Sequence, residues 1–483
     1  MAKKMLIVHG YSDGSVSFTK LGDYFAEQGF YAKDDIFYVD YASMDDEATF
    51  KDYADKLDDD FNKLFNGERI DVACHSTGAL VVRTWLVLRR ETQKALGRPL
   101  DCPVEHLLMF APANFGSDLA KLGQSFLGKV RSTFFNTNRR PEDFLESGKA
   151  VLQGLEPASP LQWTLSQYDL FEDNYSNRKS PSPDHYFNPK AKDDLVCFPF
   201  VFAAGNHYGD SLQARILKNR AKDGTDGTVR ICGTSLNTRQ LLLSFEGGST
   251  LGAWYPETKF PAVPFAVFDG LNHGSIIDPK EAAFLRATGP APLIAKALAV
   301  KSVQDYEKVA LEFAKTSDDN YGIMDGKFKD KYQQFFFRVR DDADCSVEDF
   351  FLDFMILNEK GNFDEKLSME FDENFESEFY THSADSAHRV MMVNYDKLSG
   401  FLNTLKASKA KLAFDLTAKT PLPDVKYIKA QFVVFDGATA GANRTSFLFP
   451  NTTTLVDIVL DRTQKDQLLN VKTGEKVKEE QNK

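Results

Sequence analysis

The chain has 483 residues, 42% of them hydrophobic, so it is long enough for more than one hydrophobic core, and we expect two or three domains. A net charge of −12, a pI near 5.3 and the lack of any run of basic residues argue against a nucleic-acid-binding groove. No apolar stretch reaches the roughly 20 residues that a transmembrane helix needs.

The first residues do not read as a secretory signal. The apolar run Met5–Val8 is short and enters the loop His9–Gly14 at once, which is typical of a strand and not of a signal-peptide core. The cysteines are odd in number and lack paired spacing: Cys74, Cys102, Cys197, Cys232 and Cys345. This pattern suits a reducing, cytoplasmic location without a zinc framework, although export without a cleaved signal stays open.

Strand and helix patterns alternate along the first 110 residues. Strands are predicted at Met5–Val8, Ile36–Tyr41, Ile70–Ala73 and Val104–Phe110, with helices at Ser17–Gln28 and Phe50–Phe65. Such alternation predicts a parallel sheet with helices on both faces. Sites in sheets of this kind lie at the carboxyl ends of the strands.

The segment Cys74–Gly78 lies between the strand Ile70–Ala73 and an apolar helical stretch, Ala79–Leu88. It places Ser76 at a tight strand-to-helix turn, where a serine Oγ stands clear of its own backbone and can act as a nucleophile. Cys74 departs from the pattern G-x-S-x-G, and we interpret it as a small apolar residue packed inward. The alternative is that Ser76 only caps an ordinary helix.

The loop His9–Gly14 follows the first predicted strand and can present backbone N–H groups. Preorganised donors of this kind stabilise the negative oxygen of an acyl-transfer intermediate. The predicted donors are the amides of Tyr11 and Thr77, the second of which follows Ser76 at the start of its helix. We interpret His9 as a residue that orients the loop.

Between residues 117 and 195 the alternation stops, and we predict an inserted cap. Its first part carries one apolar stripe, formed by Leu119, Leu122, Phe126 and Val130. A helix-prone apolar stretch follows, and then a polar, Pro/Ser-rich interval. The stripe either lines an acyl pocket that opens at a lipid surface or simply packs on the core beneath it.

Two later loops supply a carboxylate and an imidazole. The loop Lys222–Val229 contains Asp226, and the strand Phe265–Phe268 is followed by Asp269–Ser275, which contains His273. A neutral histidine takes a serine proton on one nitrogen while the other donates to a carboxylate. The chain order is Ser76, Asp226, His273. Asp223 and Asp269 remain alternative carboxylates.

The last third changes character after two helical stretches, Pro292–Leu298 and Val303–Ala314. Strands are predicted at Phe335–Val339, Phe350–Leu357, Arg389–Asn394, Lys411–Thr417, Tyr427–Phe435 and Thr454–Leu460. Short strands with few helices predict an antiparallel β-sandwich. The acidic cluster Asp341, Asp342, Asp344, Glu348 and Asp349 is either a calcium site or, more commonly for such clusters, a solvated turn.

Five motifs in one order resemble the α/β-hydrolases of the lipase and esterase group, over roughly residues 5 to 300. They are the loop at His9-Gly10, the turn His75–Gly78, the segment Ala111–Ser117, the loop Asp226–Val229 and the segment Asn272–Gly274. The resemblance implies Ser76 as nucleophile, His273 as general base and then acid, and Asp226 as its partner. It also implies Tyr11 and Thr77 as backbone donors and needs neither a cofactor nor a metal.

The fold expected from this resemblance is an α/β-hydrolase with a mostly parallel sheet, a helical cap insertion and a C-terminal antiparallel β-sandwich. The expected division is 1–116 and 196–315 for the core, 117–195 for the cap, 330–471 for the sandwich and 472–483 for a frayed charged tail. The residues expected near the substrate are His9, Phe115, Leu119, Leu122 and Phe126.

The expected activity is cleavage of a carboxylic ester, with a lipid acyl ester as the favoured substrate and peripheral membrane contact through the cap or the sandwich. Two alternatives stay open, because a Ser-His-Asp triad can cleave esters, amides and thioesters alike and because a fold does not determine a function. They are amide or thioester cleavage by the same residues and a non-catalytic binding or scaffold protein.

Overall fold

The computed structural model describes residues 3–11, 14–41, 43, 45–118, 120, 149–171, 187, 196–205, 223–245, 251–255, 262–324, 329–374, 378–419, 426–427, 429–439 and 447–463. The predicted stripe residues Leu119, Leu122, Phe126 and Val130, most of the cap and the tail 472–483 lie outside these ranges.

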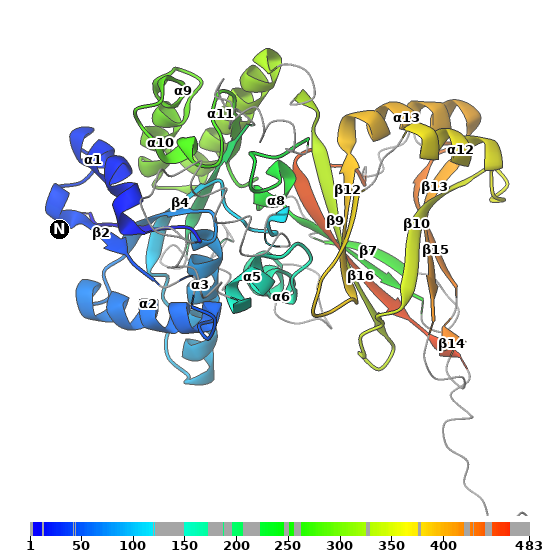
Figure 1. Cartoon of the computed structure of the whole chain (residues 1–483), viewed down its shortest axis with the longest axis horizontal. Coiled ribbons are helices and arrows are strands. Elements are labelled where there is room, and N and C mark those ends of the chain that lie inside the picture. Colours follow the sequence, from blue (N-terminus) through cyan, green and yellow to red (C-terminus); the bar gives the residue numbers. More distant parts are fainter. Residues whose placement is uncertain are drawn as a thin grey trace, which may run out of the picture.

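One parallel sheet forms the centre of the N-terminal region (Figure 1). Its strand order is β2-β1-β3-β4-β5-β8, and every neighbouring pair is parallel. The strands are β1 (Met5–Val8), β2 (Ile36–Val39), β3 (Ile70–His75), β4 (Val104–Phe110), β5 (Phe198–Ala204) and β8 (Phe265–Phe268). The alternation of strands and helices along the sequence predicted a parallel sheet, and the structure confirms it.

Helices cover both faces of this sheet because side chains alternate along each strand. Met5 and Ile7 join a hydrophobic cluster with α1 (Thr19–Glu27), α10 (Pro290–Leu298) and α11 (Val303–Ile323). Leu6 and Val8 join a second cluster with α2 (Phe50–Phe65) and α3 (Gly78–Ala95). The shorter helices are η1 (Ser15–Phe18), η2 (Lys33–Asp35), α8 (Ile231–Thr234), η7 (Ser275–Ile277) and α9 (Ala282–Leu285).

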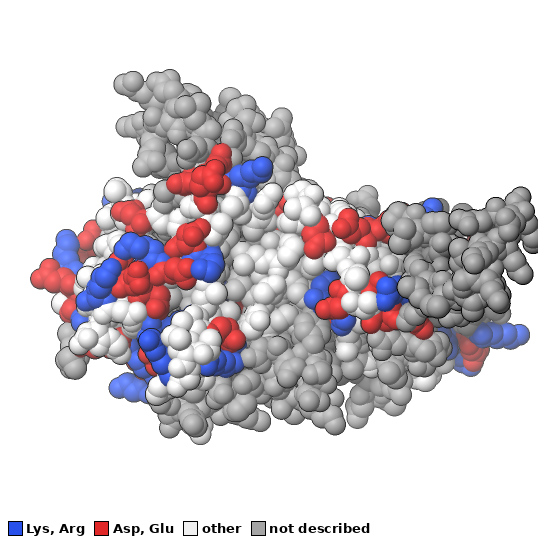
Figure 2. Space-filling view, turned by 90° about the horizontal axis from the view of Figure 1, so that it is seen from below, with Lys and Arg blue, Asp and Glu red and all other residues white. Residues whose placement is uncertain are grey.

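Helix α2 shows how local sequence sets the ends of an element. It begins at Thr49, whose side chain and that of Asp52 form a reciprocal capping box. It ends at Asn66, which adopts the left-handed conformation with a φ of 48°. Its exposed side carries the ion pairs Lys51–Asp55 and Lys56–Asp60. On the face drawn in Figure 2, the described acidic and basic side chains are intermixed.

The C-terminal region consists of two further sheets that enclose a third hydrophobic cluster. A six-stranded sheet has the order β11-β12-β9-β16-β6-β7, and a three-stranded antiparallel sheet has the order β10-β13-β15. Their strands are β9 (Tyr332–Asp341), β10 (Phe350–Leu357), β11 (Glu378–Thr381), β12 (His388–Asn394), β13 (Lys411–Ala418), β15 (Ala430–Asp436) and β16 (Thr452–Leu460). Two helices, α12 (Glu365–Asn374) and α13 (Tyr395–Ser408), and the small pair β14 (Lys426–Tyr427) and β17 (Arg462–Thr463) complete this region.

The six-stranded sheet also takes in a hairpin from the middle of the chain. Strands β6 (Arg239–Ser244) and β7 (Leu251–Tyr255) pair antiparallel with one another, and β6 pairs parallel with β16. Because β9 is also parallel to β16, this C-terminal sheet is mixed and not purely antiparallel. Residues 239–255 were expected in the core, but β6 pairs with a strand more than 200 residues away, and a pairing over that distance leaves no pattern in the local sequence.

The described helices of the segment 117–195, which was predicted to be a cap, are α5 (Lys149–Leu155) and α6 (Pro160–Asp169), and they lie against α2 and α3. A buried ion pair joins α6 to α3, with Arg83 Nε 2.6 Å from Asp169 Oδ2. Among the described residues, no helix is both long and apolar enough to cross a membrane. The expected fold class, a mostly parallel α/β core with C-terminal sheets, is confirmed.

Candidate active site

Ser76 lies in a strained turn between β3 and α3. Its φ of 54° falls in the left-handed region, which a residue with a side chain adopts only where the surrounding structure imposes it. Two hydrogen bonds to the neighbouring β4 chain impose it here, since the Ser76 amide donates to Phe110 O at 3.1 Å and Ser76 O accepts from the Ala113 amide at 3.1 Å. The turn is thus held from the side by the next strand.

The two small positions that flank Ser76 differ in how much space they have. A Cβ at Gly78 would lie 2.6 Å from His9 O and 2.7 Å from Val8 O, so only glycine fits. Cys74, by contrast, is buried and packs within the hydrophobic cluster beneath α2 and α3. A side chain is tolerated there because it points into the core, which explains the departure from G-x-S-x-G.

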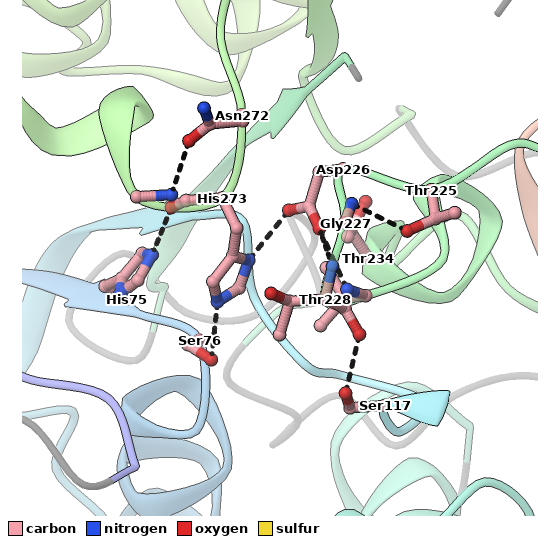
Figure 3. A network of polar contacts seen from close by, with 12 residues as sticks. His75, Ser76, Ser117, Thr225, Asp226, Gly227, Thr228, Thr234, Asn272 and His273 are labelled. Carbon is pink, nitrogen blue, oxygen red and sulfur yellow. Dashed lines mark hydrogen bonds and ion pairs between the residues drawn. The ribbon is translucent and has the colours of Figure 1, made fainter. Parts of the chain in front are cut away.

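The structure brings Ser76, His273 and Asp226 together at the carboxyl edge of the sheet (Figure 3). His273 Nε2 lies 3.0 Å from Ser76 Oγ, and His273 Nδ1 lies 2.8 Å from Asp226 Oδ2. His273 and Asp226 are buried, with exposures of 4% and 1%. A carboxylate only accepts, so Nδ1 carries the proton and the lone pair of Nε2 faces the hydroxyl.

Of the three candidate carboxylates, Asp226 has a hydrogen bond to His273 in the structure. Its second oxygen, Oδ1, accepts from the amides of Thr228 at 2.9 Å and Val229 at 2.8 Å. Asp269 instead lies beside Arg286, with 3.4 Å between Oδ2 and Nη2. The loop itself therefore fixes the orientation of the Asp226 carboxylate.

His75, which sequence reasoning did not single out, contacts the backbone of His273. Its Nε2 lies 2.8 Å from His273 O, and the two rings are 4.6 Å apart. A carbonyl only accepts, so Nε2 of His75 donates. Burial, together with the neighbouring His273, holds the pKa of His75 well below its usual value, so His75 stays neutral. Its position just before Ser76 was the available signal.

The loop after β1 packs directly against the nucleophile turn. A Cβ at Gly10 would lie 3.0 Å from Ser76 Cβ, so the backbone at Gly10, which precedes Tyr11, closely approaches Ser76. His9 holds this loop, since its Nδ1 lies 2.7 Å from Gly10 O and its ring stacks on Tyr41 at 4.2 Å. Thr77 begins α3, and the partial positive charge at a helix N-terminus favours an anion there. The amides of Tyr11 and Thr77 remain the predicted oxyanion donors.

Phe115 lies in the contact between the core and the C-terminal region. It is buried in a cluster that includes Trp163 of the cap and Phe336 of β9. Ser117, two residues later, donates from Oγ to Thr228 O at 2.6 Å and so supports the loop of Asp226 (Figure 3). Contacts of His9 and Phe115 with a substrate stay predictions, and Leu119, Leu122 and Phe126 lie outside the described residues.

One group of side chains in the described chain has the spacing of a metal site. It consists of Asp71, Glu105 and His106, at the edge of the sheet opposite to Ser76. The Lys3 ammonium lies 3.1 Å from Asp71 Oδ2 and so supplies a positive charge to this group.

The acidic cluster near residue 341 is tied into its own turn. Asp341 Oδ1 accepts from the amides of Ala343 at 2.9 Å and Cys345 at 3.0 Å, and Asp342 pairs with Arg462 at 2.7 Å. Asp341 is buried, with an exposure of 3%, so this carboxylate holds the turn from within.

Comparisons with known proteins agree with this architecture. A family model described as Lipase (class 2) matches residues 3–137. Two structures of phospholipase PlaB from Legionella pneumophila, one in complex with thio-NAD, are 24% identical, with 98% of this chain and 96% of that chain covered and TM-scores of 0.75 and 0.76. The mature lipase BlEst2 from Bacillus licheniformis is 15% identical over 62% of this chain and 93% of its own, with a TM-score of 0.36. No curated protein matches the chain.

Proposed function

We propose that this lipase/esterase-like α/β-hydrolase cleaves carboxylic esters and that acyl lipids are its substrates. The observation that carries the proposal is the continuous hydrogen-bonded chain from Ser76 Oγ through His273 to Asp226. The match to the class 2 lipase model and the likeness to a phospholipase support a lipid ester as substrate.

In the acylation step, Nε2 of His273 takes the proton of Ser76 Oγ as that oxygen attacks the ester carbonyl. The carbonyl oxygen becomes negative and is stabilised by the amides of Tyr11 and Thr77, each such donor being worth roughly 2.7–4 kcal/mol in other enzymes. Asp226 stabilises the imidazolium that forms. His273 then gives its proton to the leaving alcohol, and the acyl group stays on Ser76.

In the deacylation step, His273 takes a proton from water, and the resulting nucleophile attacks the acyl carbonyl. The same two amides stabilise the second intermediate. His273 returns the proton to Ser76 Oγ, and the free acid leaves. His75 stays neutral throughout, because burial lowers its pKa, and its role is to hold the backbone of His273.

A labelled fluorophosphonate tests the triad directly, because it bonds only to an activated serine. We expect wild type to be labelled, Ser76→Ala to be unlabelled, and Ser408→Ala, which removes a serine from α13, to be labelled at the wild-type rate. A folded wild-type protein that is not labelled would favour the scaffold alternative.

The substrate class needs a second experiment. Wild type and Ser76→Ala are incubated with a total lipid extract, and the lipids that disappear are identified by mass spectrometry. We expect loss of acyl lipids with wild type alone. Labelling by the probe without loss of any lipid ester would turn attention to amides or thioesters.

We also propose that the protein acts in the cytoplasm and meets its lipid at a membrane surface through the cap or the C-terminal sheets. Sedimentation with phospholipid vesicles tests the surface contact. Fractionation of the source cells tests the location, and recovery outside the cytoplasm would contradict it.

A further inference from the structure

The loop that carries Asp226 lies between the core and the C-terminal sheet. Figure 1 shows α8, which directly follows this loop, next to strands β9 and β16. Gly224 has a φ of +67°, and a Cβ there would lie 2.3 Å from the ring of Tyr332 in β9. Thr453 Oγ1 of β16 donates to Cys232 O at 3.2 Å. The C-terminal sheet therefore forms one wall of this loop.

Arg230 closes the loop at its base. Residues Thr225 and Arg230 form an antiparallel bridge, and the Ile231 amide donates to Gly224 O at 2.9 Å. The Arg230 side chain also reaches back to the start of the loop, where its Nη1 donates to Asp223 O at 2.9 Å. The guanidinium thus joins both ends of the turn that has Asp226 at its tip.

The same guanidinium connects three separate parts of the molecule. Its Nε donates to Asp118 Oδ2 at 2.8 Å, and its Nη2 donates to Glu378 Oε2 of β11 at 2.7 Å. The Arg230 side chain is only 3% exposed, whereas the side chains of Asp118 and Glu378 are 18% and 41% exposed, so the guanidinium is buried and its two carboxylate partners lie toward the surface. Burial alone would lower the pKa of Arg230, but Asp118 and Glu378 outweigh it and raise that pKa. Arg230 therefore stays charged, and the carboxylates of Asp118 and Glu378 balance its positive charge.

We propose that Arg230 is a positioning residue for Asp226 and that Glu378 holds Arg230 in place, which makes the C-terminal sheet part of the proposed catalytic apparatus. This inference rests on the proposed function. Asp226 can accept from His273 only while its loop holds the carboxylate at the observed distance. Small displacements of such groups cost large factors in rate. Sequence reasoning had no signal for this role, because Asp118 and Glu378 are each more than 100 residues from Arg230.

The test removes the distant partner and leaves the loop itself unchanged. Glu378→Ala is compared with Glu359→Ala, which removes a carboxylate of the same region from an exposed pair with Lys409. We expect Glu378→Ala to lower kcat for a short-chain ester about 10-fold with KM within twofold, because the loss acts on the chemical step. Glu378→Gln, whose amide oxygen still accepts from Arg230, should recover most of the rate. Glu359→Ala should match wild type.

A double-mutant cycle separates positioning from simple destabilisation. In an Asp226→Asn background, Glu378→Ala should cause no further loss, because its effect passes through Asp226. An equal loss in both backgrounds, or no loss in either, would overturn the proposal.

Hydrogen–deuterium exchange gives a readout that does not need catalysis. The amides of residues 223–231 should exchange faster in Glu378→Ala than in Glu359→Ala or wild type. If the fluorophosphonate does not label wild type, the proposed function fails while the exchange result still decides whether Glu378 holds the loop. Unchanged exchange at 223–231 would reject the inference by itself.

Discussion

The two edges of the parallel sheet each carry a buried histidine hydrogen-bonded to an aspartate. At the amino ends of β3 and β4, His106 Nδ1 lies 2.8 Å from Asp71 Oδ1, and at the carboxyl edge His273 Nδ1 lies 2.8 Å from Asp226 Oδ2. The two pairs differ at the other ring nitrogen. Nε2 of His106 lies 2.7 Å from the carbonyl oxygen of Val300, whereas Nε2 of His273 lies 3.0 Å from the hydroxyl of Ser76.

A histidine–aspartate contact therefore does not by itself make a catalytic base. A carbonyl only accepts, so Nε2 of His106 must carry a proton and cannot take another. Around Asp71, burial raises the pKa, but His106, Lys3 and the Tyr31 hydroxyl outweigh burial and lower it. The amino-edge pair is therefore a closed ion network with a structural role, and the carboxyl-edge pair has a proton acceptor facing a hydroxyl.

The sharpest test of this comparison exchanges each histidine for glutamine. We expect His273→Gln to lower kcat by about 10⁴-fold or more, because Ser76 loses its base. His106→Gln should keep kcat within about threefold of wild type, measured per site titrated with fluorophosphonate. Comparable losses in both variants would remove the distinction between the two edges.

Exchanging the aspartates should separate activity from stability. Asp226→Asn is expected to lower kcat by about 10³- to 10⁴-fold, since an amide favours the wrong tautomer of His273. Asp71→Asn should instead lower the free energy of unfolding by about 3 kcal/mol, because it leaves Lys3 and His106 without their buried partner. Urea unfolding and ester hydrolysis measure the two effects. A large activity loss in Asp71→Asn would contradict this division.

The free energy of unfolding should depend on pH partly through Asp71. Its folded-state pKa is lowered, so its contribution is fully present above the unfolded value near 4 and is lost as pH falls through that value toward the folded one. Between pH 5 and 3, the unfolding free energy of wild type should therefore fall more steeply than that of Asp71→Asn. If chemical denaturation gave the same pH dependence for wild type and Asp71→Asn, the proposal that Asp71 is charged in the folded chain would be contradicted.

A third histidine, His75, is expected to have the smallest effect, which is on the pH dependence of the free energy of unfolding. His75, like His106, has Nε2 on a carbonyl, and burial lowers its pKa well below 6.5. The unfolded chain binds this proton below about pH 6.5 and the folded chain does not, so unfolding should become easier by up to about 1.4 kcal/mol per pH unit as pH falls. His75→Gln should reduce this slope. The pKa of His388 is also lowered, so His388 adds to the slope with the same sign. Because it does so in both wild type and His75→Gln, its contribution cancels in the comparison. An unchanged slope would show that His75 takes up a proton in the fold.

The sequence was sufficient for features that depend on neighbouring residues. Strands of the parallel sheet were found from short apolar runs. Ser76 and His273 were chosen in the segments after two of these runs, and Asp226 was chosen in a polar loop further along the chain. Gly78 was recognised as a small position, and the structure adds the reason, a close approach of the β1 backbone.

Features that depend on distant pairing were out of reach. Nothing near β6 indicates that its neighbour is β16, and nothing near Arg230 indicates Glu378. The sequence favoured Asp226 but left Asp223 and Asp269 as alternatives, because all three are acidic residues in glycine-containing loops. His75 could have been noticed, since it adjoins Ser76, but its contact with His273 arises only when two loops 198 residues apart meet.

The insertion of β6 beside β16 has a consequence for biosynthesis. A nascent chain in which residues 1–320 have left the ribosome already contains Ser76, Asp226 and His273, yet β6 still lacks the strand against which it lies. The support of the Asp226 loop by β9, β11 and β16 arrives only with later translation. The surroundings of the Asp226 loop seen in the folded chain are therefore complete only after residues 452–460 have been synthesised.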